Sequence, residues 1–190
     1  MEPTFKKNLE DHISIINNLS ELDSKIENTA KIILKSVIDG GTIFWCGNGG
    51  SAADCQHYAT ELMVKYSRKR APISSIALTT DTSLITAHSN DFDFKTVFSR
   101  QVEALVKPKD VFIGISTSGN SENVFLALKK ASEIGACTVS ILGNNGGKIK
   151  EISQNPIIVP SNITARIQEA HLLIGHFLCD FLEYNLGDSL

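Results

Sequence analysis

The stretch TIFWCGNGGSAAD, residues 42–54, decides the fold class. An apolar run, Thr42–Cys46, leads directly into a glycine-rich loop and then into a helical pattern that begins near Ser51. This order is typical of a parallel strand in an α/β sheet, where ligands bind beyond the carboxyl ends of the strands. The loop has neither the Gly-Lys-Ser/Thr ending of a Walker loop nor the G-x-G-x-x-G spacing of a dinucleotide site. A tight glycine turn without a ligand is the alternative interpretation.

The same alternation of strand and helix continues along the chain. Four further apolar runs are candidate strands with helical patterns between them: Ile73–Leu78, Val111–Ile115, Cys137–Leu142 and Ile157–Val159. Short strands rich in Ile and Val suit a parallel sheet that is covered on both faces. The sequence therefore predicts one α/β domain over residues 1–190, with an open doubly wound sheet, an N-terminal helical hairpin over residues 1–40 and a long last helix.

Composition narrows the class of protein. The 190 residues are 42% hydrophobic and carry a formal net charge of -3, which gives no general attraction for nucleic acid or an anionic membrane surface. No apolar run reaches the roughly 18 residues that span a bilayer, and the first residues lack the pattern of a secretory signal. The cysteines form no C-x-x-C pair, so we expect reduced thiols in a cytoplasmic protein; they are Cys46, Cys55, Cys137 and Cys179.

A second loop predicts a phosphate site. Residues 115–121 read ISTSGNS and place four hydroxyls around one glycine, between a strand and a helix. Backbone N–H groups and the positive end of a helix attract a phosphate, and hydroxyls add donors without a fixed charge. The four are Ser116, Thr117, Ser118 and Ser121. A simple helix cap is the alternative.

Histidine and carboxylate side chains suggest a catalytic or metal site. His57 and Glu61 lie four residues apart on one helix face, which suits a divalent metal, a base with its orienting partner, or an ordinary surface pair. His176 lies in an apolar helix, where a histidine needs a partner or is a satisfied core residue. Gln168 is eight residues before His176, a rise of about 12 Å along the helix. The two side chains would therefore reach one metal more easily from neighbouring copies than from the same chain. His171, which shares a face with Gln168, is an alternative to His176.

Two apolar surfaces suggest association between copies. The N-terminal segment carries apolar residues on more than one side, and it packs either on its own sheet or on another subunit. The last helix is apolar around most of its circumference, and such a helix must be buried on nearly all sides. In a domain this small, we expect a second copy to provide the cover.

Three motifs together resemble the sugar isomerase (SIS) domain family, and within it the phosphoheptose isomerases, over nearly the whole chain. They are Gly47–Ala52, Gly114–Ser121 and Ala165–Glu169. The resemblance implies a flavodoxin-like five-stranded sheet, and a homotetramer with active sites at subunit interfaces and one zinc ion per subunit. It also implies conversion of sedoheptulose 7-phosphate to D-glycero-D-manno-heptose 7-phosphate, the first step towards activated heptose for lipopolysaccharide or capsule.

The resemblance also assigns roles to residues. Glu61 and His176 would be the acid/base pair. The zinc ligands would be His57, Glu61, Gln168 and His176. The sugar phosphate would be held by Asn48, Gly49, Gly50, Ser51, Glu61, Asn90, Asp91, Ser116, Thr117, Ser118, Ser121 and Gln168. One position departs from the family pattern, because Val64-Lys65 stands before Tyr66 where the isomerases commonly have Gly-Arg.

Other functions of the same fold stay open on the sequence alone. One relative is a non-catalytic protein that binds the bacterial replication initiator. It lacks the acid and the histidine at the positions of Glu61 and His176, so their presence here favours an enzyme. A sugar-phosphate-sensing regulator usually carries an appended DNA-binding domain, for which 190 residues leave no room. An isomerase of another sugar phosphate is a further alternative.

Overall fold

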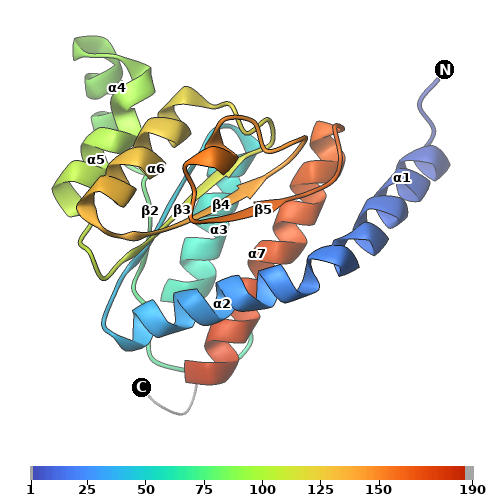
Figure 1. Ribbon diagram of the computed structural model, residues 1–190, viewed down its shortest axis with the longest axis horizontal. Coiled ribbons are helices and arrows are strands. Elements are labelled where there is room, and N and C mark those ends of the chain that lie inside the picture. Colours follow the sequence, from blue (N-terminus) through green and yellow to red (C-terminus); the bar gives the residue numbers. More distant parts are fainter. Residues whose placement is uncertain (1, 187–190) are drawn as a thin grey trace.

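A computed structural model describes residues 2–186 and contains a five-stranded, all-parallel sheet (Figure 1). The strands stand in the spatial order β2-β1-β3-β4-β5, which is the order of flavodoxin-like folds. Their bounds are β1 Ile43–Gly47, β2 Ser75–Ala77, β3 Val111–Ser116, β4 Cys137–Leu142 and β5 Asn155–Ile158. The predicted doubly wound α/β fold is confirmed.

Helices cover both faces of the sheet (Figure 1). Alternate strand residues point to opposite faces, so Ile113 joins one apolar cluster and Phe112 the other. The first cluster includes residues of α2 Asp23–Ile38, α3 Gly50–Met63 and α7 Thr164–Leu186. The second includes residues of α5 Val97–Leu105 and α6 Glu122–Ile134, with α4 Thr82–Asp91 packed at its edge. The fully buried β1 and β3 lie at the centre of both.

The N-terminal segment differs from the expected hairpin. It contains two helices, as predicted, but α1 Phe5–Asn18 and α2 run end to end through the short 3₁₀ turn Leu19–Leu22 (Figure 1). The residues that flank this turn, Asn18 and Asp23, keep right-handed helical dihedral angles, and residues 18–23 contain no Gly or Pro. The chain therefore does not reverse between them, and each of the two helices packs against α7.

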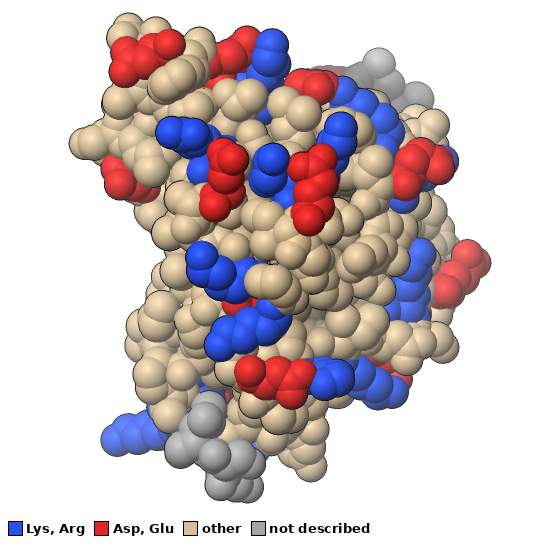
Figure 2. All heavy atoms as spheres, turned by 60° about the vertical axis from the view of Figure 1, so that its left-hand side comes forward, with Lys and Arg blue, Asp and Glu red and all other residues tan. Residues whose placement is uncertain are grey.

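Charged side chains of both signs share one face of the molecule (Figure 2), and the four cysteines, which all lie within residues 2–186, form no disulfide. On the face drawn in Figure 2, acidic and basic side chains are interspersed, with no large area of a single sign. None of the helices within residues 2–186 has the length and apolar character needed to cross a bilayer. All four cysteines are free thiols, and three of them, Cys46, Cys55 and Cys179, are buried.

Candidate active site

The two predicted ligand-binding loops meet at the topological switch point of the sheet, where the helices after two neighbouring strands pass to opposite faces. β1 and β3 are neighbours, and the helices that follow them, α3 and α6, cover opposite faces. The amide side chains of Asn48, after β1, and Asn123, at the start of α6, donate to each other over 2.9 and 2.8 Å. In open α/β sheets this switch point is where ligands bind. Asn123 is a contributor that loop composition did not identify.

The glycine loop is covered by a side chain from the last helix. A Cβ on Gly50 would lie only 2.3 Å from the Nε2 atom of Gln168, so the amide of Gln168 packs directly on the loop. Gly49 has a φ of +55° and precedes α3, and Ser51 is buried at the start of that helix. The structure thus brings Asn48, Gly49, Gly50 and Gln168 together in one chain.

The hydroxyl loop forms a compact cluster at the start of α6. The hydroxyl of Ser116 lies 3.0 Å from that of Ser121 and 3.5 Å from that of Ser118, and it accepts a hydrogen bond from the N–H of Gly119. Ser121 is the N-cap residue, but its side chain makes no capping hydrogen bond. The simple cap therefore does not account for the cluster. Thr117 is half-buried beside it.

A polar hollow adjoins the hydroxyl loop. Its volume is about 630 Å³. Besides Ser118 and Asn120, it is lined by residues that follow β4 and β5, which are Asn144, Asn145, Pro160, Ser161 and Asn162. Loop composition alone did not identify these later residues, because none of them belongs to a motif. The hollow provides room for a ligand beside the hydroxyl loop.

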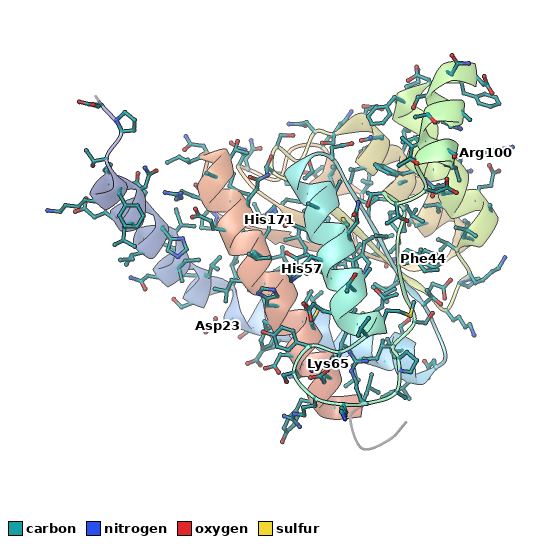
Figure 3. The ribbon with its side chains drawn as sticks, turned by 180° about the vertical axis from the view of Figure 1, so that it is seen from behind. Asp23, Phe44, His57, Lys65, Arg100 and His171 are labelled. Carbon is teal, nitrogen blue, oxygen red and sulfur yellow. The ribbon has the colours of Figure 1, made fainter. Side chains whose placement is uncertain are left out.

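The histidines and Glu61 meet between α3 and α7. The Nε2 atoms of His57 and His176 are 2.9 Å apart, and His57 Nε2 is 3.4 Å from Glu61 Oε1. Figure 3 shows His57 between the two helices. His171 is fully buried instead, and burial lowers its pKa to about 4. The structure therefore joins His176, and not His171, to the predicted pair.

Two further side chains belong to this cluster. Asp54 lies one helical turn before His57, and burial raises its pKa while the charges of His57 and His176 partly offset that effect. Asp54 and His57 are three residues apart, a spacing that places both on one helix face and could have identified Asp54 from the sequence. The ring of Tyr66 lies 5.7 Å from the ring of His176. Tyr66 follows the end of α3, where no helical spacing could have identified it.

The donor types at this cluster fit zinc, although one chain does not complete a metal site. Within residues 2–186, no group of three or more His, Cys, Asp or Glu side chains is arranged to hold a metal ion. Two nitrogen ligands of a tetrahedral zinc lie roughly 3.3 Å apart, close to the observed separation of the His57 and His176 nitrogens. The Gln168 amide is held at the glycine loop instead.

Two predicted binding residues lie away from the others in a single chain. Asn90 and Asp91 are exposed near the end of α4, and the Asn90 amide donates to the Asp91 carboxylate over 2.8 Å. α4 lies on the opposite side of the sheet from α3 and α7 (Figure 1). Their role in the site stays a prediction that requires a second copy. Lys65, at the position where the family commonly has arginine, is exposed.

Comparison with known proteins agrees with this geometry. A family model described as the SIS domain matches residues 8–143. The phosphoheptose isomerase of Aquifex aeolicus (strain VF5) is 53% identical over 159 residues, which are 84% of this chain and 83% of that protein. Solved phosphoheptose isomerases from Neisseria gonorrhoeae and Francisella tularensis superpose with TM-scores of 0.89 and 0.91 at 39% and 32% identity. Each comparison covers 94% of this chain and 96% of the other. By its fold, its motifs and these relatives, the chain belongs to the SIS domain family and, within it, to the phosphoheptose isomerases.

Proposed function

We propose that this protein is a phosphosugar isomerase that converts sedoheptulose 7-phosphate to D-glycero-D-manno-heptose 7-phosphate. The observation that carries the proposal is the meeting of Glu61, His57 and His176 in a chain that also builds a hydroxyl loop at the switch point of the sheet. The relatives support an isomerase and not the non-catalytic alternative. Glu61 and His176, which that alternative lacks, are both present.

The reaction moves one proton between neighbouring carbons. A base removes a proton from C1 of the ketose, next to the C2 carbonyl, and the electron pair forms the double bond of an enediol as the carbonyl oxygen takes up a proton. Return of a proton to C2, with loss of the O1 proton, gives the aldose. Glu61 is the base in this proposal, since a carboxylate beside an imidazole can accept and return the carbon-bound proton. His57, 3.4 Å away, orients it.

His176 handles the oxygen protons in this scheme. Its Nε2 lies 2.9 Å from that of His57, so one ring donates and the other accepts, or both present lone pairs to a cation between them. The His176 side chain is partly exposed, and an imidazole has one nitrogen that can donate a proton and one that can accept it. These properties support His176 as the acid/base partner of Glu61.

The hydroxyl loop anchors the phosphate in the proposed complex. The hydroxyls of Ser116, Ser118 and Ser121 lie close together at the amino end of α6, where backbone N–H groups and the helix dipole favour an anion. The glycine loop and the Gln168 amide lie alongside, because Asn48 and Asn123 join the two loops. Binding at the phosphate end leaves the other end of the sugar free to extend to Glu61.

Zinc is part of the proposal as a resident ion, one per subunit. His57, Glu61 and His176 are its candidate ligands, although within residues 2–186 of one chain they are not arranged to hold a metal ion. A ligand role for Gln168 would need a neighbouring copy, since in its own chain Gln168 lies at the glycine loop. A bound zinc ion would polarise the sugar carbonyl or organise the side chains around it.

The proposed assembly is a homotetramer with active sites at its interfaces. On α1 the side chains of Phe5, Leu9 and Ile13 are exposed along one stripe, and on α7 Leu172 and Leu173 are exposed as well. Exposed apolar stripes of this kind mark association surfaces. A neighbouring copy also offers the simplest route for Asn90 and Asp91 to reach a site. We place the enzyme in the cytoplasm, at the start of the synthesis of activated heptose for lipopolysaccharide or capsule.

One experiment tests the activity and the metal together. The purified protein is incubated with sedoheptulose 7-phosphate, and the aldose is followed by NMR with and without a chelator. We expect the aldose signals to appear, and to weaken when zinc is removed and recover when it is restored. Absence of any aldose from metal-loaded protein would refute the proposed activity. Turnover that survives complete zinc removal would refute the metal role alone. Analytical ultracentrifugation of the same sample measures the assembly.

A further inference from the structure

A buried ion pair lies beneath the cluster of Glu61 and His176. Arg70 Nε is 3.1 Å from Glu183 Oε2, and both side chains are completely inaccessible to solvent. Arg70 belongs to the segment after α3, and Glu183 to α7, more than one hundred residues later. Removing two charges from water is costly, and apolar residues would often stabilise a core as well or better. A contribution to stability therefore does not by itself account for this pair.

Glu183 holds the segment that carries Tyr66. Its Oε2 accepts a hydrogen bond from the N–H of Tyr66 at 2.9 Å, and its Oε1 accepts from the N–H groups of Ser67 and Arg68 at 2.6 and 2.7 Å and from the Ser67 hydroxyl at 2.9 Å. Burial raises the pKa of this carboxyl group, but these donors outweigh burial and lower the pKa to about 2. The carboxylate is thus a charged anchor for three successive residues.

Arg70 holds the end of the helix that carries Glu61. One guanidinium nitrogen donates to the carbonyl oxygens of Leu62 and Ala71 at 2.8 and 2.9 Å, and the other donates to the carbonyl oxygen of Glu61 at 2.8 Å. The last carbonyls of a helix have no partner within the helix, so a cation that binds them defines where the helix ends. Arg70 therefore binds the main-chain carbonyl of Glu61, the proposed base.

The pair joins all the parts that must meet for catalysis. Glu183 follows His176 by seven residues, two helical turns, so both lie on one face of α7. The segment between α3 and Arg70, marked by Lys65 in Figure 3, curves beneath the ends of α3 and α7. Through it the pair links Glu61 on α3, Tyr66 in the segment and His176 on α7. The ring of Tyr66 is thereby held 5.7 Å from the ring of His176.

We propose that Arg70 and Glu183 are positioning residues for the isomerisation: together they set the distance of Glu61 and Tyr66 from His176. This inference rests on the proposed acid/base roles of Glu61 and His176. The hydroxyl loop after β3 is not part of this network.

Arg70→Lys is the most informative variant. Lysine keeps the charge, but one ammonium group cannot reproduce the planar fork that contacts Glu61, Leu62 and Glu183 at once. A displacement of about 1 Å at a reacting group costs roughly 100-fold in rate, so we expect kcat to fall between 10- and 100-fold. KM for sedoheptulose 7-phosphate should stay within about twofold, because the hydroxyl loop is untouched. Arg100→Lys is the matched control, since Arg100 is exposed and, among residues 2–186, its ion pair is with Glu103 at 3.7 Å.

Glu183→Gln provides an independent arm if Arg70→Lys does not fold. Glutamine keeps the size and one acceptor oxygen, and we expect the same fall in kcat with an unchanged KM. Folded variants that keep the wild-type kcat and only melt at a lower temperature would overturn the inference, because the pair would then serve stability alone. Failure of both variants to fold would overturn it for the same reason. A wild-type protein without isomerase activity would instead refute the proposed function, and this inference with it.

Discussion

Replacing Gly175 with alanine tests whether the contact between α3 and α7 sets the active site. A Cβ on Gly175 would lie 2.2, 2.3 and 2.7 Å from three ring atoms of Tyr58, far closer than packed atoms allow. The Tyr58 ring has little room to move, because it packs on Trp45 with ring centres 5.3 Å apart and its hydroxyl donates to the carbonyl of His171 at 3.0 Å. We therefore expect α7 itself to shift away from α3.

The expected magnitude follows from two opposing effects. Overpacking of a well-packed core costs about 1–3 kcal/mol. Alanine is better than glycine within a helix by about 1 kcal/mol, which offsets part of that cost. A net loss of up to about 2 kcal/mol lowers the melting temperature of a domain of this size by up to about 8 °C. Because Gly175 is next to His176, a shift of about 1 Å also separates His176 from His57 and lowers kcat by roughly 100-fold.

Thermal unfolding and the kcat of the folded protein measure the two effects separately. The control is the double variant Gly175→Ala with Tyr58→Leu, in which the smaller side chain makes room for the new methyl group. In a double-mutant cycle the two substitutions should then be coupled, with the double variant more stable than the sum of the single effects. Gly175→Ala protein with the melting temperature and kcat of the wild type would refute the proposed contact.

Three shorter predictions concern the proposed chemistry and the buried histidine. Glu61→Gln is nearly isosteric, so it should reduce kcat by at least about 100-fold without changing the circular dichroism spectrum, and an active variant would remove Glu61 from the role of base. Ser116→Ala combined with Ser118→Ala should raise KM by roughly 10- to 100-fold with little change in kcat, since hydrogen bonds to a charged group are worth about 1.5–3 kcal/mol; an unaltered KM would mean that the loop is structural. Burial lowers the pKa of His171 to about 4 in the folded protein. Between pH 6.5 and 4 this histidine is therefore protonated in the unfolded chain but not in the folded one, and the free energy of unfolding falls as the pH decreases. Urea unfolding between pH 7.5 and 4.5 should show a loss of up to about 3 kcal/mol that is absent in His171→Leu, and equal slopes for both proteins would contradict this.

The fold was predictable where burial imposed a simple pattern. β1 and β3 are buried on both faces, so each had to be a continuous apolar run, and runs of that kind are visible in the sequence. The hairpin was wrong for a local reason. Periodicity located both N-terminal helices, but the direction of the chain between them depends on the dihedral angles of residues 18–23, which stay helical because no Gly or Pro interrupts them.

Spacing and composition predicted the site only where its residues are neighbours in sequence, whereas the pairing of Glu61 with His176 was implied by the resemblance to the SIS domain family. His57 and Glu61 share a helix face, and four hydroxyls crowd one loop, so spacing and composition indicated both. The partners of these groups come from far along the chain. Glu183 contacts Tyr66 across 117 residues, and Asn123 contacts Asn48 across 75. No local pattern encodes such pairs, because they exist only once the helices have packed.

The packing of α3 on α7 also separates the two roles predicted for Gln168. The two helices contact each other at two levels, Gly50 with Gln168 near the loops and His57 with His176 further along. The levels are seven residues apart on α3 and eight on α7, a rise of about 10–12 Å. Within one chain, Gln168 therefore serves the substrate level and does not reach a metal held by the histidines.

Gln168→Ala distinguishes these roles in the assembled protein. If Gln168 acts on the substrate, the variant should keep one zinc ion per subunit by atomic absorption and show a raised KM for sedoheptulose 7-phosphate. His57→Ala is the comparison, because loss of an imidazole ligand should remove the metal. Loss of zinc from Gln168→Ala to the extent seen in His57→Ala would contradict the argument. It would mean that Gln168 from a neighbouring copy completes the metal site, since its own chain keeps the amide at the glycine loop.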